Sequence, residues 1–485
     1  MGDTKQQHDC PNCAKLSQQI AELTAQIAEL KAHNAALTAR MEDLESKLAN
    51  AKKNSSNSSK PPSTDIVSPK EQPRKGGTRK KRKRGGQPGH KRHEREPFEP
   101  GEIDEFWTWG YSKCPCCDGE LVDGKKPVKT LQQVELPVVP VTVAQHDIHA
   151  QHCSRCNRTF IAQFPEELRK AGLIGPRLTA LVGFLKGACH MSYSAIRKYF
   201  RDVIGVKISR GMLRKLVGKV SDALADPYEA LLALLEREKR LNIDETGHKE
   251  NGRRLWTWCF RAYLYTVYKI SPSRGSQVLV EVLGEEFNGI LGCDYFSAYR
   301  KYMKDFGVLV QFCLAHFIRD VKFLADHSNP KNRAYGKRLL ADLRKLFGVI
   351  HRRDEYASEK TFQRALERAR DQLMWDAMRR RPYTKEASNL SKRFRDNAKG
   401  YFRFITEPDV EPTNNLAEQA IRFVAIHRRI TQGTRSEDGR RWCERIWTVI
   451  QTCRQQQRSV FEFLCRAVES HFRSAPAPAL VPDTS

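Results

Sequence analysis

Apolar residues recur with a period of seven along residues 14–50, and this is the most regular pattern in the chain. The repeat consists of Leu16, Leu23, Leu30, Leu37 and Leu44 at one position, and Ile20, Ile27, Asn34, Met41 and Leu48 at the other. Leucine at d with isoleucine and one polar residue at a favours a parallel two-stranded coiled coil. The alternative is an amphipathic helix packed against its own domain, which so many unbroken heptads disfavour. We therefore expect a homodimer, or a higher oligomer, through this helix.

Residues 51–100 change to a composition rich in Ser, Pro, Gly and basic residues, with few apolar side chains. Such a segment cannot bury a core, which predicts a disordered basic linker. It contains the run Arg79, Lys80, Lys81, Arg82, Lys83 and Arg84. Because dense basic side chains release counterions when they lie along DNA, we expect this run to contact phosphates rather than to serve only as a solubilising tail. A second disordered segment is predicted at residues 473–485.

Two C-x-x-C pairs stand in residues 105–165, separated by a strand-like stretch. Their cysteines are Cys114, Cys117, Cys153 and Cys156. Tetrahedral zinc is well served by two thiolates from each of two turns, so the spacing predicts a zinc-ribbon DNA-binding domain with structural Zn²⁺. Disulfides are the alternative, but paired spacing in a chain of this size favours thiolate ligands in a reducing compartment.

Residues 170–230 read as helices separated by a turn at Gly205, with Ser209 suited to cap the helix that follows. That helix carries Arg210, Arg214 and Lys215. This is the pattern of a helix-turn-helix whose second helix enters a major groove, although helix pairs of this kind also occur in plain cores.

The charge of the whole chain also indicates binding to nucleic acid. It has 485 residues, a formal net charge of +27 and a pI of about 9.6, a balance typical of proteins that bind a polyanion such as double-stranded DNA. There is no secretory signal and no apolar stretch long enough to span a membrane. We therefore expect several domains, no membrane partner and a cytoplasmic, nucleoid-associated location in a bacterium.

Two aspartates follow short apolar runs in residues 238–320. Asp244 comes after Leu241–Ile243, and Asp294 comes after Gly289–Cys293. A charge at the end of a buried strand is costly unless it is paired or binds a metal. A β-meander and one helix separate the two, and a mixed sheet of ribonuclease H type would bring such strand ends together. Much later, Glu418 lies in a helix expected to start near Thr413 or Asn414, with Arg422 four residues on. That pair alone would read as a surface ion pair.

Several motifs together resemble the transposases of the insertion sequence 66 family. They include "NIDETGHKENGRRLWTW", "LGCDYFSAY", "CLAHFIRDVKF", "NNLAEQAIR" and "QGTRSEDGRRWCERIWTVIQTCRQQ", and upstream "NSSKPPS" and "GGQPGH". The resemblance implies a multidomain α+β protein with a ribonuclease H-like mixed α/β catalytic core and DDE chemistry. Its carboxylates would be Asp244, Asp294 and Glu418. One departure is His248, where the family commonly has a bulky aromatic residue.

The resemblance further implies two Mg²⁺ ions per active site, or Mn²⁺, held by these carboxylates. The expected activity is 3′-end cleavage and strand transfer at the terminal inverted repeats of an insertion sequence, on element and target DNA. It also implies accessory proteins from the same element. Three carboxylates can hold two such ions about 4 Å apart for an in-line displacement.

The gap between the second and third carboxylates is too long for one crossover. Residues 321–405 read as a basic α-helical insertion, and residues 406–472 as the helical end of the core. Cys313 and His316 form a C-x-x-H that resembles one in several transposase families. Zinc there would need two further ligands, so a structural contact near the active site is expected. Arg428 and Arg429 join Arg422 as expected DNA contacts.

The main alternative is a non-catalytic zinc-ribbon DNA-binding protein, such as a repressor or a decayed transposase. A nuclease on the same fold is a third class. The three carboxylates favour an enzyme, and the coiled coil and basic insertion favour a transposase over a simple nuclease.

The paired cysteines yield the first prediction. Metal analysis of the reduced protein should find at least one zinc per chain, because four thiolates complete a tetrahedral site. Zinc that persists in a double variant with Cys114→Ser and Cys153→Ser would contradict the assignment.

The heptad repeat yields the second prediction. Asn34→Leu should give a more stable but less uniquely dimeric coiled coil, because a buried asparagine pair weakens the coil yet fixes its register. Sedimentation of the isolated 14–50 peptide measures its oligomeric state. A peptide that stays monomeric at high concentration would refute the coiled coil.

Overall fold

The computed structural model describes most of the chain beyond residue 140 and shorter stretches before it. The described residues are 11–51, 97–106, 115–118, 120, 130–132, 141–153, 155–156, 158–407 and 409–481. They form two compact units, one within 1–70, 148–198 and 208–485 and the other within 71–147 and 199–207. The fold is α+β with a mixed sheet and many helices, as the sequence predicts. The run from Arg79 to Arg84, and almost all of segment 51–100, lies outside the described residues.

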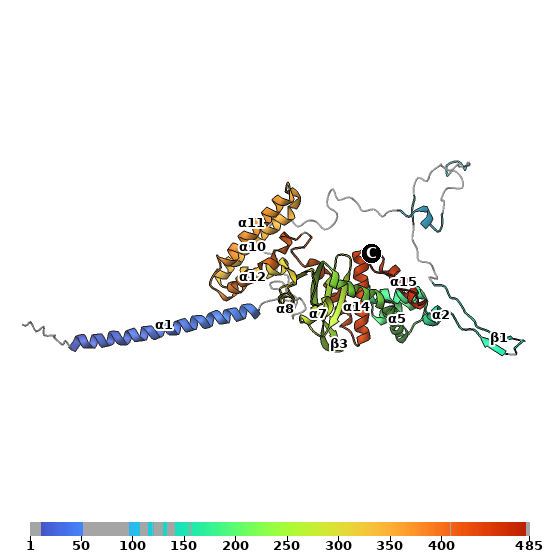
Figure 1. Cartoon of the computed structure of the whole chain (residues 1–485), viewed down its shortest axis with the longest axis horizontal. Coiled ribbons are helices and arrows are strands. Elements are labelled where there is room, and N and C mark those ends of the chain that lie inside the picture. Colours follow the sequence, from blue (N-terminus) through green and yellow to red (C-terminus); the bar gives the residue numbers. More distant parts are fainter. Residues whose placement is uncertain are drawn as a thin grey trace, which may run out of the picture. The chain divides into compact units, whose positions relative to one another are not determined.

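The heptad segment is one continuous helix, α1 (Pro11–Ala51), drawn in blue in Figure 1. The large apolar side chains of both repeat positions are exposed, from 47% for Leu37 to 62% for Met41. This face is therefore not covered by any described part of the same chain.

The region 170–230 is helical, as the sequence predicts. Its elements are α2 (Glu166–Ala171), α3 (Pro176–Gly187), α4 (Tyr193–Tyr199), the π-helical turn η3 (Phe200–Ile204), α5 (Arg210–Ala223), α6 (Ala225–Leu234) and η4 (Leu235–Arg237). Gly205 is left-handed, with φ of +78°, and the Ser209 side chain accepts a hydrogen bond from Met212 N at 3.1 Å. Both the predicted turn and the predicted N-cap are confirmed.

A five-stranded mixed sheet forms the centre of the first unit. Its strands are β3 (Arg240–Glu250), β4 (Arg253–Arg261), β5 (Thr266–Ser271), β6 (Ile290–Cys293) and β7 (Leu309–Phe312). The order is β5-β4-β3-β6-β7. Strands β3, β4 and β5 are antiparallel neighbours, and β6 and β7 continue from β3 in parallel.

The prediction that Asp244 ends its strand is wrong. β3 continues to Glu250 and pairs with β4 along its whole further length. The reason is the Asn251–Gly252 turn, whose residues have φ of +47° and +82°. Two left-handed residues match the twist of a tight hairpin, so the chain folds straight back. Asp244 is instead where pairing with β6 stops, because that ladder ends at Asn242 and Gly292.

Helix α14 (Glu437–Gln455) lies along the outer edge of β5 and satisfies its backbone. Thr266 N, Tyr268 N and Ile270 N donate to Thr452 Oγ1 at 3.2 Å, Thr448 Oγ1 at 3.1 Å and Glu444 Oε1 at 2.6 Å. Four helical residues rise about 6.0 Å, and two strand residues span about 6.7 Å. Every fourth side chain of α14 therefore meets every second backbone N–H of β5. The edge strand is thereby closed to pairing with another chain.

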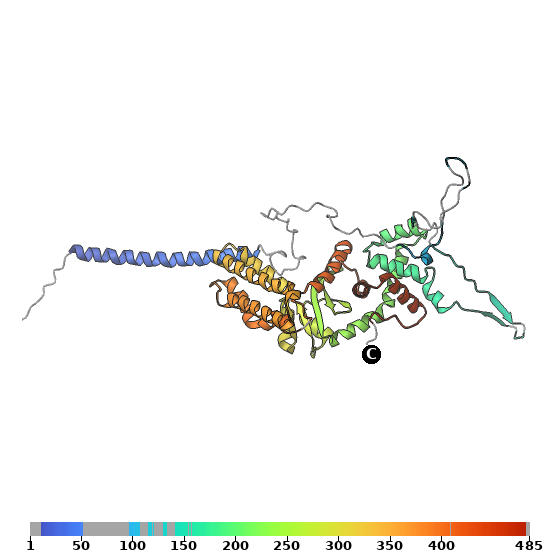
Figure 2. The same cartoon turned by 90° about the horizontal axis from the view of Figure 1, so that it is seen from above.

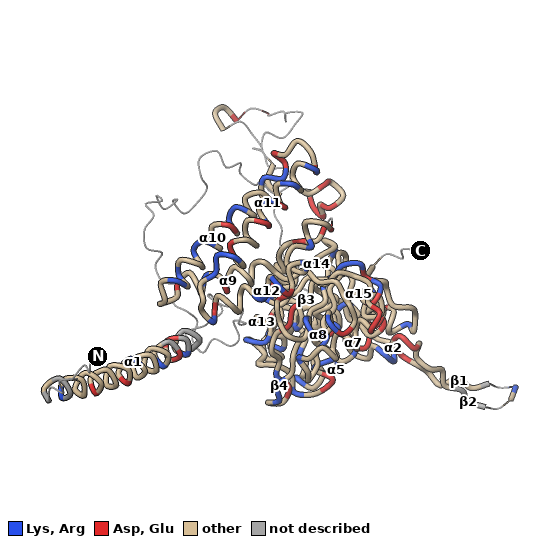
Figure 3. Tube along the Cα trace, turned by 60° about the vertical axis from the view of Figure 1, so that its left-hand side comes forward, with Lys and Arg blue, Asp and Glu red and all other residues tan. Residues whose placement is uncertain are grey.

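Five further helices belong to this unit. They are α7 (Gln277–Leu283), α8 (Ser297–Phe306), α9 (Leu314–Ala325), α13 (Asn415–Thr431) and α15 (Val460–Phe472). Of these, α13 packs against β3 and β4, whereas α15 packs against α3 and α5. The insertion between the carboxylates contains α10 (Pro330–His351), η5 (Arg353–Glu355), α11 (Glu359–Met378), α12 (Lys385–Tyr401) and η6 (Arg403–Ile405). Its three long helices pack side by side in both views (Figures 1 and 2). Figure 3 shows Lys and Arg recurring along α9, α10 and α11.

Two peripheral segments complete the description. β1 (Ala150–Cys153) and β2 (Arg158–Ile161) form an antiparallel hairpin, whereas 141–149, expected to be strand-like, contain no strand. Residues 473–481 lack helix and strand, but the prediction of disorder does not hold for them. Leu480 is buried, and its carbonyl accepts a hydrogen bond from Arg458 Nη1 at 2.9 Å. Within the part of the chain that the structure describes, no helix is long and apolar enough to cross a membrane.

The edge contact of Glu444 predicts a pH-dependent stability. Burial raises the pKa of Glu444 from 4.5 to about 7. A pKa raised by folding means that the native state loses stability as pH rises from 4.5 through 7, because a buried carboxylate must then ionise. The loss is roughly 3 kcal/mol of unfolding free energy at most.

Glu444→Gln keeps an acceptor for Ile270 N and removes the ionisation. The variant should melt at a higher temperature than the unmodified protein at pH 8, and at a similar temperature at pH 4. Glu437→Gln, on the exposed face of the same helix, is the control and should show no such gain. A Glu444→Gln profile parallel to that of the unmodified protein at all pH values would refute the prediction.

Candidate active site

Asp244 and Asp294 lie at equivalent positions on neighbouring strands. The β3–β6 ladder pairs Asn242 with Gly292, and each aspartate follows two residues later. Asp244 Oδ1 accepts a hydrogen bond from Glu245 N at 3.0 Å, and Asp294 Oδ1 accepts one from Phe296 N at 2.9 Å. The structure therefore brings together two carboxylates that the sequence separates by fifty residues.

Burial raises the pKa of both aspartates. The pKa of Asp244 is well above its ordinary value, through burial first and then through Glu245, Asp294 and Glu418. The pKa of Asp294 rises to about 7, through burial and the charge of Glu245. Carboxylates that raise each other's pKa in this way repel as anions, and a bound cation would relieve the repulsion.

Glu418 reaches the same region from the first turn of α13. Its backbone N donates to Asn414 O at 3.1 Å, and its side chain is 15% exposed. Arg319 Nη2 donates to Glu418 Oε2 at 3.2 Å, and His316 Nδ1 lies 3.4 Å from Glu418 Oε1. Two residues of α9 thus act on one carboxylate, which the sequence alone would have placed on the surface.

Cys313 and His316 lie near the third carboxylate. Among the described residues, one set of three Cys, His, Asp or Glu side chains has ligand atoms all within 4.8 Å of one another, and it is Cys313, His316 and Glu418. Asp244 and Asp294 do not belong to it. Burial raises the pKa of the Cys313 thiol to about 11, and burial with Arg319 lowers the pKa of His316.

Asn414 is a buried connector that sequence reasoning missed. It is 1% exposed. Its Nδ2 donates to Ile243 O at 2.7 Å, its Oδ1 accepts from Asn242 Nδ2 at 2.9 Å, and its backbone N donates to Cys313 Sγ at 3.1 Å. One amide therefore joins the strand before Asp244, the start of α9 and the start of the helix that carries Glu418. The only signal was its position four residues before Glu418.

A comparison with known protein families matches the part of the chain that contains the sheet and the candidate site. The family model described as "Transposase IS66 family" matches residues 171–441, which is more than half of the chain and includes the sheet and all three carboxylates. The chain belongs to the IS66 family of transposases. A second model, a family of unknown function (DUF6444), matches residues 9–96.

Three relatives of this IS66 chain come from Sinorhizobium fredii (strain NBRC 101917 / NGR234), and all are uncharacterized. Protein y4hP is 24% identical over 70% of this chain and 67% of its own length. Protein y4qI is 25% identical over 64% of this chain and 62% of its own length. Protein y4jD is 26% identical over 42% of this chain and 43% of its own length. The chain thus spans about two thirds of the first two relatives.

Glu245, the second acidic residue of the DET motif, is a structural carboxylate in this IS66 member. It is 4% exposed. Arg274 donates to Glu245 Oε1 from Nε at 2.9 Å and from Nη2 at 2.6 Å, and Tyr299 Oη donates to Oε2. The arginine lies against the rings of Trp256 and Phe296. Neighbouring Asp and Glu residues point to opposite faces of β3, which explains their different surroundings.

His248 is buried in the same strand. Its Nε2 lies 3.1 Å from Thr434 Oγ1, and its ring contacts Trp447 edge-on. Burial and Arg428 lower its pKa to about 4. A neutral imidazole therefore packs among the buried side chains of the core.

The cations expected to contact DNA have different surroundings. Arg214 and Lys215 are exposed on α5, where Arg210 donates to Ser194 Oγ at 2.7 Å. Arg422 and Arg429 are exposed on α13. Arg428 is half-buried and donates to Thr246 Oγ1 at 3.1 Å and to the Gly247 carbonyl. The structure gives Arg428 a role inside the fold.

Of the four cysteines predicted to bind zinc, Cys114 lies outside the described residues, as does the side chain of Cys153. Cys117 and Cys156 are exposed free thiols. Cys117 belongs to one compact unit and Cys156 to the other.

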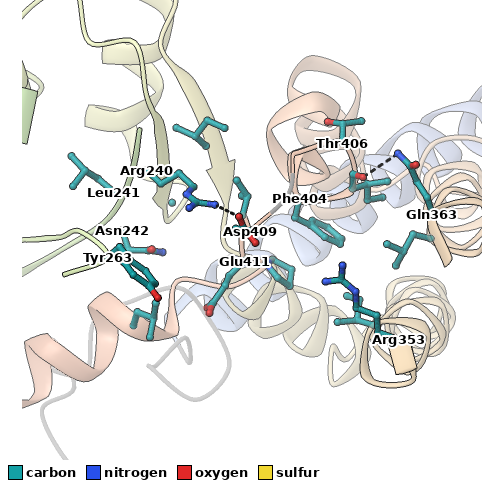
Figure 4. Close-up of a pocket in the computed structure, with 18 of the residues that line it drawn as sticks. Arg240, Leu241, Asn242, Tyr263, Arg353, Gln363, Phe404, Thr406, Asp409 and Glu411 are labelled. Carbon is teal, nitrogen blue, oxygen red and sulfur yellow. Dashed lines mark hydrogen bonds and ion pairs between the residues drawn. The ribbon is translucent and has the colours of Figure 1, made fainter. Parts of the chain in front are cut away.

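A cavity of about 850 Å³ lies near the start of β3, and its lining includes none of the three carboxylates. Its walls come from β3, the end of β4, the helical insertion and segment 404–416 (Figure 4). Arg240 crosses one wall to pair with Asp409 at 3.0 Å. This cavity is therefore separate from the candidate active site.

Proposed function

We propose that this chain is a DDE transposase that cleaves and joins DNA at Asp244, Asp294 and Glu418. The observation that carries the proposal is the convergence of three half-buried carboxylates, from β3, the end of β6 and the start of α13. Membership of the IS66 transposase family supports it. The mixed sheet, with three antiparallel and two further parallel strands, supports a ribonuclease H-like core.

The donor set fits magnesium better than a softer metal. Mg²⁺ and Mn²⁺ prefer carboxylate oxygens, and the raised pKa values of Asp244 and Asp294 indicate negative charge that lacks compensation. Asp244, Asp294 and Glu418 would hold two ions, as Mg²⁺ or Mn²⁺. When bound, such ions activate an attacking oxygen and stabilise the leaving one.

The chain's own residues supply position and charge. The sheet fixes Asp244 and Asp294 relative to each other through backbone pairing, and Asn414 fixes the helix that presents Glu418. Hydrolysis of the element's 3′ end and transfer of that end to target DNA are both in-line displacements at phosphorus. One site can therefore serve both steps, and neither requires a covalent protein intermediate.

Other parts of the chain would bind the DNA and the second copy. We propose that α1 pairs in a parallel coiled coil, and that the zinc ribbon with structural Zn²⁺, the basic arm and α5 bind the terminal inverted repeats. The basic insertion would contact DNA phosphates beside the site. Accessory proteins of the same element belong to this proposal. The alternative, a DNA-binding protein without catalysis, keeps all these parts and differs only in the chemistry.

The carboxylates should be needed for chemistry and not for DNA affinity. Asp244→Asn, Asp294→Asn and Glu418→Gln should each lower 3′-end cleavage in magnesium at least about 100-fold, since loss of a residue that only orients a metal ligand already costs about 10- to 100-fold. Gel shifts of element-end DNA should stay unchanged or tighten slightly, because each change removes negative charge beside the DNA.

Glu286→Gln, an exposed acidic position after α7, is the matched control and should cleave normally. Cleavage at the unmodified level by any carboxylate variant would remove that residue from the site. An unmodified protein that binds element ends but never cleaves them with magnesium would favour the non-catalytic alternative.

A further inference from the structure

We propose that His316 and Arg319 are positioning residues that hold Glu418 by both carboxylate oxygens and orient it for metal binding. The inference rests on the proposed function, because it assigns Glu418 to the metal site. It gives a role to the C-x-x-H motif and adds Arg319 of the same segment, for which no role was expected.

The first support is the two-point contact of Arg319. Its Nη1 lies 3.1 Å from His316 Nε2, and its Nη2 donates to Glu418 Oε2 at 3.2 Å. A guanidinium presents its donors in a rigid planar fork, so these two contacts fix the angle between the imidazole and the carboxylate. The three side chains form a closed ring of contacts, since His316 Nδ1 is 3.4 Å from Glu418 Oε1.

The second support is the hydrogen position that this ring requires. Arginine only donates, so His316 Nε2 must be the acceptor of the Arg319 contact. A neutral imidazole with an acceptor at Nε2 carries its hydrogen at Nδ1. That hydrogen lies on the nitrogen that approaches Glu418 Oε1 to 3.4 Å, an ion-pair distance rather than a hydrogen bond. Arg319 Nη2 also donates to Oε1, at 3.5 Å, so both carboxylate oxygens face donors of this ring.

The same hydrogen position argues against a metal ion bound by Cys313, His316 and Glu418. Their ligand atoms lie within 4.8 Å of one another, and sulfur with nitrogen would suit zinc. A metal at Nδ1 would need the hydrogen at Nε2, where it would meet the Arg319 donor at 3.1 Å. The positive charge beside His316 and Glu418 is therefore the guanidinium of Arg319.

Both positioning residues stand on a fixed element. The helix α9 begins directly after Cys313, whose backbone N donates to Cys293 O at 2.8 Å, beside Asp294. The next residue after Arg319, Asp320, accepts a hydrogen bond from Arg393 of α12 at 2.6 Å. The geometry therefore connects the third carboxylate to the strand end of the second one.

The test compares variants that keep or remove single features of this ring. His316→Asn retains an N–H donor near the place of Nδ1, and His316→Leu has none. Arg319→Lys retains the positive charge but loses the fork, so charge repulsion of the metal is unchanged. Lys301→Gln, which removes a surface cation paired with Asp305 at 2.6 Å, is the control.

Binding of Mn²⁺ to the full chain is measured by electron paramagnetic resonance, together with magnesium-dependent 3′-end cleavage, gel shift and melting temperature. We expect His316→Leu and Arg319→Lys to raise the half-saturating metal concentration about 10- to 100-fold. His316→Asn should stay within about threefold of the unmodified protein, and Lys301→Gln should not change. Gel shifts and melting temperatures should stay near those of the unmodified protein.

Asp244→Asn separates the two proposals. If Asp244→Asn weakens Mn²⁺ binding and His316→Leu does not, the positioning role is wrong while the active site stands. If Asp244→Asn binds Mn²⁺ as well as the unmodified protein, the proposed function itself fails. If His316→Asn and His316→Leu lose Mn²⁺ affinity equally, the positioning role is also overturned. Zinc lost specifically from Cys313→Ala would show that the cluster is a metal site instead.

Discussion

Repulsion among four neighbouring carboxylates is the constraint on which the structure of the core depends. Asp244, Glu245, Asp294 and Glu418 influence one another electrostatically in a half-buried place. Two of them are compensated by arginine, Glu245 by Arg274 and Glu418 by Arg319. Burial and the neighbouring carboxylates raise the pKa values of Asp244 and Asp294. Uncompensated charge thus marks Asp244 and Asp294 as suited to a divalent cation, whereas Glu418 joins them through its position beside Asp244.

Such a cluster persists only if the backbone around it cannot relax. Backbone pairing fixes β3 against β6, and Asn414 ties β3 to the beginnings of α9 and α13. On the far side of the sheet, α14 closes the edge of β5 through Glu444, Thr448 and Thr452. The free energy that holds the acidic residues together therefore comes from buried hydrogen bonds and packing on both sides of them.

The charge of the molecule is divided between this acidic centre and basic surroundings. The chain has 84 Lys and Arg against 57 Asp and Glu, and exposed cations lie on α5, α13 and the insertion. A basic surface attracts DNA, whereas an acidic centre attracts metal ions. The acidic centre repels phosphates until metal ions are bound. This division is what the proposed transposase requires, because affinity and chemistry then depend on different residues.

The sequence by itself determined the features that neighbouring residues decide. The heptads give the helix α1, Ser209 caps α5, and the apolar runs locate β6 and the start of β3, because caps and periodicity act within one or two turns. The length of β3 was open to the same reasoning through its Asn-Gly turn. Only the tertiary structure decided which distant groups meet. Arg319 and Glu418 are 99 residues apart, and Asn414 and Ile243 are 171 apart. No local pattern encodes such pairs, since they form only when separate elements bury their faces against one another.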